Sequence, residues 1–490
     1  MSEKTRSLLD LLHASRGAPL DVRLESLVNG YREQLGGPVG PGPGTLPLTE
    51  GDAIMVARAD SFRSDSCPPP ECLLRFLDEE AEGVVAGVHL AHLVLDGPHA
   101  YAGFGDREVI DALSDVLMVM IDIDPGAIAA LLDDPDALFE LVRRFLAAVE
   151  SGARLIRLDL TGPEFASAES NQRMHAVVKL VRAVCDDVAP WVVLVVDTDA
   201  TARDPGYFGD DDEAHLVGSP VLAPLVLDAF LRGDAALISE WARSRPPRSA
   251  VATYYNYLDS PDGIAVARAT EILGADRIAS LVDTVEERGG TVVRRETSGG
   301  EVPTRAHVGF LDAIVNTALP DAQRAAVYLA AQSIMLSLAG VPEIPLHSLI
   351  GTEGAHEPLD PDELTGELNE EGSLRNMVFE GYKELLRARA ASPAFAPSAS
   401  QTILDAPAEV FALLRTAAGR SERVLCLVNL TEREADVSYA VNELGLGEEK
   451  GFRELISGDY VYPSYDAGGV ISLELQPYEV MWLSEPRHDV

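Results

Sequence analysis

The sequence predicts an α/β fold, a shortened (β/α)8 barrel of the TIM type followed by a C-terminal antiparallel β domain. Two observations lead to this prediction. Between about residues 48 and 395, short apolar runs alternate with amphipathic stretches, which implies a parallel sheet with crossover helices. Six to eight such units over about 340 residues suit a closed barrel. Beyond residue 395 the helical stretches stop, which indicates a second domain.

A helical lead and a linker are expected before the barrel. Residues 6–35 read as a helix because their leucines gather on one side. Residues 36–47 consist mostly of Gly and Pro and form a linker by composition. We therefore assign residues 1–47 to the lead and linker and residues 48–395 to the barrel.

Seven apolar runs are strand candidates for the barrel. They are rich in Val, Ile and Leu and are bounded by polar or turn-forming residues. Amphipathic stretches between them, such as residues 136–152 and 174–189, are predicted helices. The strand candidates are residues 52–59, 84–93, 116–124, 153–160, 191–198, 249–259 and 340–349, the last weakened by its prolines.

Residues 396–490 have a different character. Five short strand-like runs follow one another with turn-rich links and no long helix between them. This pattern is typical of antiparallel sheets. We expect a β-sandwich-like domain over this range.

The charge of the chain is strongly acidic. It has 79 acidic and 39 basic residues and a formal charge of −40, and only four of the basic residues are lysine. An acidic, lysine-poor surface suits a high-salt cytoplasm, where salt screens the self-repulsion. The alternative is an acidic protein of a GC-rich bacterium. No basic stripe is present to neutralise phosphates, so the composition argues against a nucleic-acid partner.

The cysteines and apolar runs bear on location. Cys67 and Cys72 flank a proline-rich loop, and no second Cys or His cluster lies nearby to complete a zinc site. We read them as incidental thiols of a reducing compartment. The longest apolar run, residues 325–342, is broken by polar residues and favours a buried helix over a membrane span. The start of the chain lacks a signal-peptide pattern, so a cytoplasmic protein without a membrane partner is expected.

Arg157 and Asp159 are opposite charges within an apolar strand candidate. Residues i and i+2 of a strand point to the same face, so we expect the two side chains to meet. A nearby cation lowers the pKa of a carboxyl, so Arg157 is predicted to keep Asp159 ionised and oriented. The alternative is a buried ion pair that only stabilises the fold.

Two further acids stand where barrel enzymes place catalytic groups, at the carboxyl ends of strands. Asp197 ends one strand candidate, and Asp262 follows another. Together with Asp159 they suit the cleavage of an acetal bond. One carboxylate attacks the anomeric carbon, a second gives and takes a proton, and a third holds charge or substrate hydroxyls. The alternative for each is a strand-end acid without a catalytic role.

Several segments resemble glycoside hydrolase family 13 in the right order along the chain. "GARLIRLD" (152–159) is similar to the segment that holds the nucleophile. "VVLVVDTDATARDPGYFGDDDEAHLV" (192–217) is similar to the acid/base segment, and "NYLDSPDGIAV" (256–266) to the third-carboxylate segment. Residues 333–351 and 376–395 resemble one branch of the family, which contains sucrose phosphorylase and glucosylglycerate phosphorylase.

The resemblance implies a function and a set of residue roles. Members of this branch retain configuration and pass through a covalent glucosyl–enzyme intermediate that phosphate or another acceptor attacks. Asp159 stands at the nucleophile position, Asp197 at the acid/base position and Asp262 at the third-carboxylate position. Arg157 is the neighbouring arginine of the substrate site. The implied substrates are an α-glucoside and phosphate, with no metal or organic cofactor.

The sequence also departs from the family pattern. The acid/base position normally holds Glu, and Asp197 is shorter by one C–C bond, about 1.5 Å. Pro261 stands where the family has a substrate-binding His, and proline offers no such hydrogen bond. The excursion that normally follows the third strand is expected to be deleted. Residues 347–364 lack the Arg- and Asn-rich loop that in the phosphorylases faces phosphate or the acceptor.

These observations leave three hypotheses. The first is retaining α-glucosyl transfer by a sucrose phosphorylase-like phosphorylase or hydrolase. The second is a catalytically impaired homologue that binds a sugar or a protein partner. The third is a new hydrolytic specificity in a more open pocket.

Overall fold

The computed structural model describes most of the chain, and the statements below concern the described residues. These are residues 5, 7–8, 17–35, 45–58, 60–65, 67–91, 107–123, 135–161, 168–198, 206–297, 300–354, 356–445, 451–466 and 468–485.

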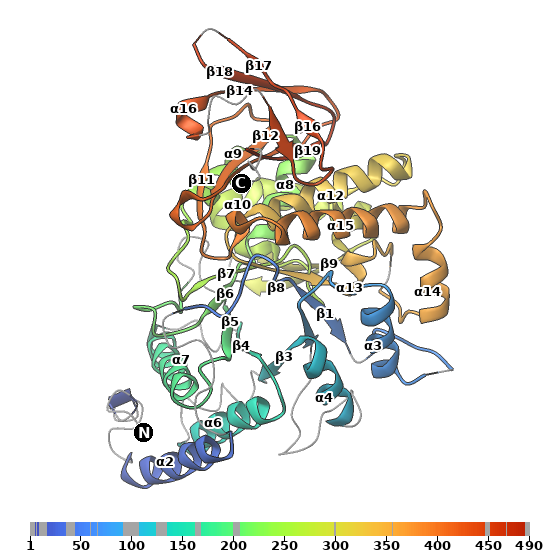
Figure 1. Cartoon of the computed structure of the whole chain (residues 1–490). Helices are drawn as coiled ribbons and strands as arrows, with labels where there is room; N and C mark the ends of the chain where they lie inside the picture. The colour runs from blue at the N-terminus through green and yellow to red at the C-terminus, as the bar shows by residue number, and fades with distance from the viewer. Residues whose placement is uncertain are drawn as a thin grey trace.

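Eight parallel strands close into a barrel at the centre of the molecule (Figure 1). Their order around the barrel is β1-β10-β7-β6-β5-β4-β3-β2. All seven predicted strands are present. The eighth, β6, escaped the sequence analysis because it has only three residues. The strands are β1 (Ile54–Arg58), β2 (Gly87–Ala91), β3 (Met118–Ile123), β4 (Leu155–Leu160), β5 (Val193–Thr198), β6 (Leu216–Gly218), β7 (Thr253–Asn256) and β10 (Val341–Pro345).

Helices cover the outside of the barrel. The two predicted crossover helices are α6 and α7, and α2 packs against both (Figure 1). The apolar run at 325–342 lies largely in α12, and no described helix is long and apolar enough to cross a membrane. The helices are α2 (Gly17–Gln34), α3 (Pro69–Glu79), α4 (Arg107–Val116), α6 (Pro135–Glu150), α7 (Ala168–Val188), α8 (Leu222–Arg232), α9 (Ala236–Arg243), η3 (Val266–Ala269), α10 (Thr270–Glu287), α11 (Phe310–Ile314), α12 (Asp321–Ser337), α13 (Leu346–Leu349), α14 (Pro361–Leu368) and α15 (Leu374–Ala390).

The C-terminal strands form two antiparallel sheets, at the top of Figure 1. One sheet has the order β11-β12-β13-β19-β15-β16 and the other β14-β18-β17. They enclose a small apolar core of their own. The strands are β11 (Ser400–Ile403), β12 (Val410–Thr416), β13 (Arg423–Asn429), β14 (Ala435–Ala440), β15 (Phe452–Glu454), β16 (Tyr460–Val461), β17 (Ser464–Tyr465), β18 (Val470–Leu475) and β19 (Val480–Ser484).

A hairpin that the sequence analysis did not predict lies between β7 and α11. Its strands are β8 (Thr291–Thr297) and β9 (Gly300–His307). Ile264 and Ala306 form an antiparallel bridge with two main-chain hydrogen bonds of 2.8 Å. Gly263 has φ +86°, and a Cβ there would lie 2.4 Å from the carbonyl oxygen of Ala306. The hairpin is therefore held directly against the loop that follows β7.

Two expectations about the chain can be compared with the structure here. Cys67 and Cys72 are joined by a disulfide, so the reading of both as incidental thiols is wrong. The two cysteines are five positions apart. Cys67 lies just before α3 and Cys72 lies in its first turns, so the start of the helix brings them together. Only residues 124–134 separate β3 from α6, too few for an inserted domain.

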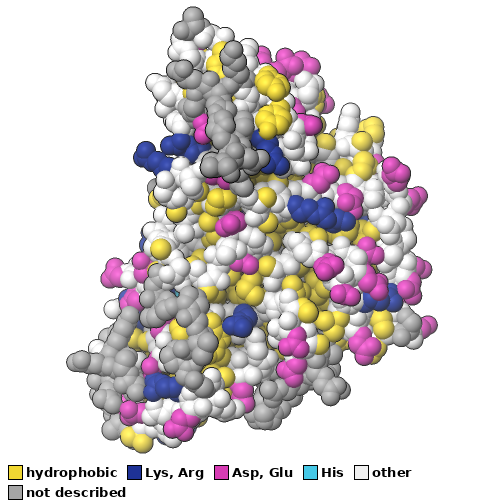
Figure 2. Space-filling model, viewed as in Figure 1, with side chains coloured by type: hydrophobic (Ala, Val, Ile, Leu, Met, Phe, Trp, Pro, Cys, Tyr) yellow, Lys and Arg dark blue, Asp and Glu magenta, His cyan; other side chains and the backbone are white. Residues whose placement is uncertain are grey.

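The two ends of the barrel differ in chemistry. One interior layer is apolar and includes Ile54, Met120, Leu155 and Val193. Charged side chains occupy the carboxyl ends of the strands instead. Acidic side chains are also scattered over the face drawn in Figure 2 rather than gathered in one patch. The buried charges at the carboxyl end are therefore clustered, unlike the acidic side chains on this face of the surface.

Candidate active site

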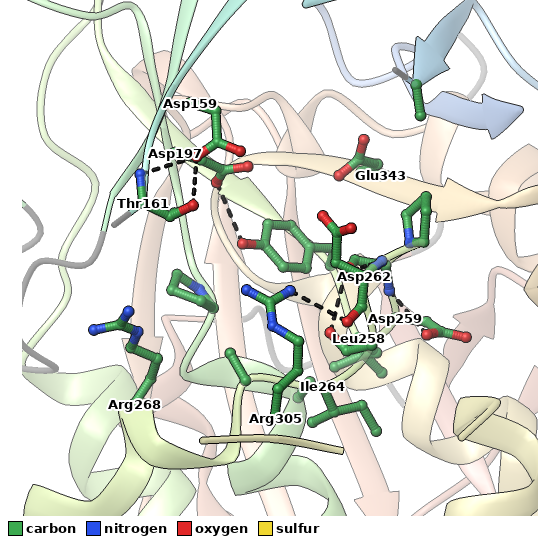
Figure 3. A pocket seen from close by; sticks show the side chains of 18 of the residues that line it. Asp159, Thr161, Asp197, Leu258, Asp259, Asp262, Ile264, Arg268, Arg305 and Glu343 are labelled. Atoms are coloured by element: carbon green, nitrogen blue, oxygen red, sulfur yellow. Dashed lines mark hydrogen bonds between the residues drawn. The ribbon is translucent and has the colours of Figure 1, made fainter. Parts of the chain in front are cut away.

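A pocket opens at the carboxyl ends of the barrel strands (Figure 3). Its walls come from β2, β4, β5 and β10 and from the loop after β7. It encloses about 50 Å³, room for a few water molecules rather than a whole pyranose ring. The structure brings together in this pocket all four site residues named from the sequence, which are Arg157, Asp159, Asp197 and Asp262.

Asp159 lies near the end of β4 and pairs in register with Asp197 on β5. Its Oδ1 accepts hydrogen bonds from the main-chain N–H of Thr161, at 2.9 Å, and from the Thr161 hydroxyl. Among the described residues no donor contacts Oδ2. Thr161 therefore fixes one carboxylate oxygen and leaves the other without a described donor.

Asp197 is 5% exposed and sits between β4 and the end of β6. Its Oδ1 accepts a 3.2 Å hydrogen bond from the Tyr257 hydroxyl. A Cβ at Gly218 would lie only 1.8 Å from that oxygen, so glycine at this position makes the room for the carboxyl. Burial raises the pKa of Asp197 to about 6, Asp159 and Glu343 add to the rise, and Arg157 opposes it. A carboxyl with this pKa can hold a proton near neutral pH and give it to a leaving group.

Asp262 lies in the loop after β7, at the exposed rim of the same pocket. Its main-chain N–H donates to the Ser260 hydroxyl at 3.2 Å, which shapes a tight turn. Pro261, at the position of the family's histidine, also lines the pocket and gives it an apolar wall. Asp262 thus lines the same pocket as Asp159 and Asp197 but is the exposed member of the three.

Arg157 does not pair with Asp159, so this prediction is wrong. Its Nε donates to Oδ1 of Asp122 at 2.7 Å, and its Nη1 donates to Oδ2 of Asp197. No ion pair joins Arg157 to Asp159 among the described residues. The i, i+2 rule gave the correct face, but a guanidinium extends well beyond its own strand and reaches the carboxylates of the two neighbouring strands.

Four buried charged residues at the site were missed, three on barrel strands and one, Asp259, in the loop after β7. His89 on β2, Asp122 on β3 and Glu343 on β10 are 2%, 9% and 5% exposed. The signal was available, because each is a charged residue within an apolar strand, "GVHLA", "MVMIDI" and "VPEIP". The same signal had led to Arg157.

Two other histidines support the scaffold. His175 on α7 lies 2.8 Å from Glu213 and stacks on Tyr207 with the ring centres 4.4 Å apart. His215 accepts a 2.9 Å hydrogen bond from the main-chain N–H of Leu194, and burial lowers its pKa to about 3. Neither lines the pocket.

Two arginines add positive charge to the pocket wall. Arg268 comes from η3 and Arg305 from β9 of the hairpin. Arg305 Nη1 donates a 3.3 Å hydrogen bond to the main-chain carbonyl of Asp262 (Figure 3). From the sequence, such charge was expected only in residues 347–364. The hairpin supplies it from a different part of the chain.

The fold and the site together define a class of protein. A parallel eight-stranded barrel with three carboxylates and a partly buried arginine at its carboxyl end, combined with the segment resemblances, is the arrangement of the α-amylase superfamily. No family model matches the chain. The chain is 31% identical to a glucosylglycerate phosphorylase of Spirochaeta thermophila over 580 aligned positions, which cover 99% of each chain.

The chain therefore belongs to the sucrose phosphorylase and glucosylglycerate phosphorylase branch of glycoside hydrolase family 13, and it is a carbohydrate-active protein of the α-glucosyl-transferring type. A glucosylglycerate phosphorylase of Allomeiothermus silvanus is 28% identical over 97% of each chain. The alignment with the Spirochaeta protein has 580 positions although this chain has 490 residues, so it contains gaps on this side.

Solved structures agree on the fold. A sucrose 6F-phosphate phosphorylase from Thermoanaerobacter thermosaccharolyticum superposes with a TM-score of 0.64 over 84% of this chain and 97% of that chain, at 12% identity. An α-amylase from H. orenii gives a TM-score of 0.60 over 89% and 99%, at 15% identity. The predicted barrel fold is confirmed.

Proposed function

We propose that the protein transfers an α-glucosyl group to inorganic phosphate with retention of configuration. The observation that carries this proposal is the meeting of Asp159, Asp197 and Asp262 in one pocket, with the pKa of Asp197 raised to about 6. Retaining transfer needs one ionised carboxylate and one protonated carboxyl on opposite sides of the same bond. The paired strands β4 and β5 hold Asp159 and Asp197 side by side.

The reaction has two steps. In the first, Oδ2 of Asp159 attacks the anomeric carbon, the bond to the aglycone oxygen breaks, and Asp197 gives that oxygen its proton. In the second, a phosphate oxygen attacks the glucosyl ester, the bond to Asp159 breaks, and the phosphate proton passes to Asp197. Asp262 faces the hydroxyls or the positive charge that develops on the ring.

The anion in the second step is assigned to Arg268 and Arg305. Both line the pocket next to Asp262, and a guanidinium binds phosphate or carboxylate oxygens with charge-assisted hydrogen bonds. The relatives named above are glucosylglycerate phosphorylases. Glycerate carries a carboxylate, so an acidic aglycone and phosphate share the chemistry that these arginines recognise.

The test of the proposal is a glucosyl-transfer assay in molar salt. The protein is incubated with an activated aryl α-glucoside and with glucosylglycerate, each with and without phosphate. We expect phosphate-dependent formation of α-glucose 1-phosphate, with the α configuration confirmed by NMR. The Asp159→Asn variant should lose at least about 10⁴-fold in rate. Turnover that Asp159→Asn does not reduce would rule out the assigned nucleophile.

Arg305→Ala tests the assignment of Arg268 and Arg305 to anion binding. Loss of one charge-assisted contact should raise the KM for phosphate roughly tenfold or more, with little change in phosphate-independent hydrolysis of the aryl glucoside. Arg295→Ala is the matched control, because Arg295 lies on the same hairpin but is exposed and outside the pocket. Equal effects of the two variants would contradict the assignment.

A homologue that binds sugar without turnover is the second candidate. The comparisons give it no support, and the observation that keeps it is the cavity of about 50 Å³. Glucose binding by calorimetry together with no turnover and no trapped glucosyl adduct would favour it over transfer.

We also propose that the protein works in a high-salt cytoplasm, supported by the charge of −40. Stability that rises between low and molar salt would support the salt requirement. The argument for a reducing compartment no longer applies to Cys67 and Cys72, because these two residues form a disulfide.

A further inference from the structure

Five charged side chains form a connected series across the mouth of the barrel, here called the charged series. Its members, in order of contact, are Glu343, His89, Asp122, Arg157 and Asp197. They come from five different strands, β10, β2, β3, β4 and β5. The far end of the series, Asp197, is the proposed acid/base group, whereas His89 and Glu343 have no role in the steps above.

His89 is in contact with a carboxylate through each ring nitrogen. Nδ1 lies 2.6 Å from Oε1 of Glu343, and Nε2 lies 2.9 Å from Oδ1 of Asp122. A neutral imidazole has only one N–H, and both ring nitrogens are donors only in the imidazolium. Only an imidazolium can therefore donate to both carboxyl groups at once.

Asp122 links this cation to the next one. Its Oδ1 accepts from both His89 and Arg157 Nε, and its Oδ2 lies 3.4 Å from Arg157 Nη2. With Nε and Nη2 directed at Asp122, the remaining Nη1 is directed at Asp197. The orientation of the guanidinium toward Asp197 thus depends on where Asp122 is held, and His89 holds Asp122 from the opposite side.

We propose that His89 is a positioning residue. Held between Glu343 and Asp122, it fixes the guanidinium of Arg157 against Asp197 and so sets how readily the acid/base group gives up its proton. This inference rests on the proposed function for its kinetic part. Its spectroscopic part does not depend on turnover.

The charges around the series fix the direction of the effects. Glu343 and Asp122 face His89. Arg157, Asp159, Glu343 and the Tyr257 hydroxyl act on Asp197. Burial alone would lower the pKa of His89, but Asp122 and Glu343 outweigh it and raise the pKa to about 9. At neutral pH the charged series contains two cations. Removing a cation must raise the pKa of Asp197, and removing a carboxylate must lower it.

The kinetic test compares His89→Gln with Glu343→Gln. In the pH profile of kcat/KM for a natural glucoside, the fall at high pH, here called the basic limb, reports loss of the proton from Asp197. We expect loss of the His89 cation to move this limb to higher pH, and loss of the Glu343 carboxylate to move it to lower pH. Each shift should be on the order of half to one pH unit. A merely structural role would not give shifts of opposite sign.

His175→Gln is the matched control, because His175 also contacts one carboxylate but lies outside the pocket. It should leave the limb in place. Shifts of equal sign in His89→Gln and Glu343→Gln would overturn the proposal.

NMR of the ring nitrogens of histidine-labelled protein decides the case even without turnover. The His89 signals, assigned as those missing in His89→Gln, should remain those of an imidazolium from pH 6 to pH 8. A neutral His89 ring at pH 7 would overturn the inference. Absence of turnover with an imidazolium at His89 would instead count against the proposed function alone.

Discussion

Two regions of this molecule hold arginines largely away from water, and the partners of these arginines differ. At the mouth of the barrel, Arg157 is bound by the carboxylates of Asp122 and Asp197. At the contact between barrel and β domain, Arg415 is fully buried and donates to the main-chain carbonyls of residues 337, 394 and 396. Arg389, beside it, likewise binds only main-chain carbonyls among the described residues.

The difference separates the candidate active site from a structural contact. Burial lowers the pKa of Arg415 to about 9, and no described carboxylate compensates it, whereas carboxylates hold the pKa of Arg157 well above its usual value in spite of burial. Carbonyl oxygens cannot gain or lose a proton. Carboxylates can, so only the group around Arg157 can take part in proton transfer.

Among the changes that test this comparison, Arg157→Met should have the largest effect. Without the guanidinium, Asp122 and Asp197 become buried carboxylates with fewer partners, which costs roughly 3–5 kcal/mol of unfolding free energy. The rate of glucosyl transfer should fall by roughly 10³-fold, because Asp197 loses its orientation. Denaturant unfolding and the transfer assay measure the two losses. An active Arg157→Met protein would remove the distinction between the two regions.

Arg415→Met should affect stability alone. It leaves three buried carbonyl groups without their donor, and we expect a loss of about 3 kcal/mol. The specific activity of the folded fraction should not change, because Arg415 lies outside the pocket. Chemical denaturation and the activity per folded molecule are the measurements. A large loss of activity in fully folded protein would contradict the comparison.

Gly218→Ala tests the space around Asp197, the proposed acid/base carboxyl. The new Cβ would be placed 1.8 Å from Oδ1 of Asp197 and must displace it. We expect a loss of roughly 10- to 100-fold in kcat, the usual consequence of moving a catalytic group by about 1 Å. Gly366→Ala in α14 is the control, because nothing lies within 4 Å of its Cβ. Equal activity of the two variants would refute the assigned position of Asp197.

The smallest effect is a response to pH in the unmodified protein. The pKa of Asp197 lies near 6, and the protonated form is the acid, so the proton is present below this pH and is lost above it. We expect kcat/KM for a glucoside with a poor leaving group to fall about tenfold per pH unit above pH 6. An aryl glucoside with a good leaving group should show a flatter profile. Parallel profiles for the two substrates would remove Asp197 from the acid role.

Much of this could be predicted from the sequence because it depends on local patterns. Apolar runs predicted seven of the eight barrel strands, and β6 was missed because three residues give no periodicity. Asp159 was found because it shares an apolar strand with an opposite charge, and Asp197 because barrel enzymes place catalytic groups at the carboxyl ends of strands. Glu343 is also a charged residue in an apolar strand, but the prolines of that strand were read only as a sign of a weak strand.

The sequence by itself determined the order of strands and helices, the acidic surface and the identity of the carboxylates at the strand ends, because each follows from residue type and spacing along the chain. Only the tertiary structure decided which charges meet. Arg157 binds Asp122 and Asp197 rather than Asp159, and Arg305 reaches the pocket from a hairpin 43 positions after Asp262. Strand pairing places Asp122 and Asp197 on either side of Arg157, and the Ile264–Ala306 bridge holds the hairpin with Arg305 against the loop after β7. Long side chains then pair across these tertiary contacts, which no local pattern in the sequence records.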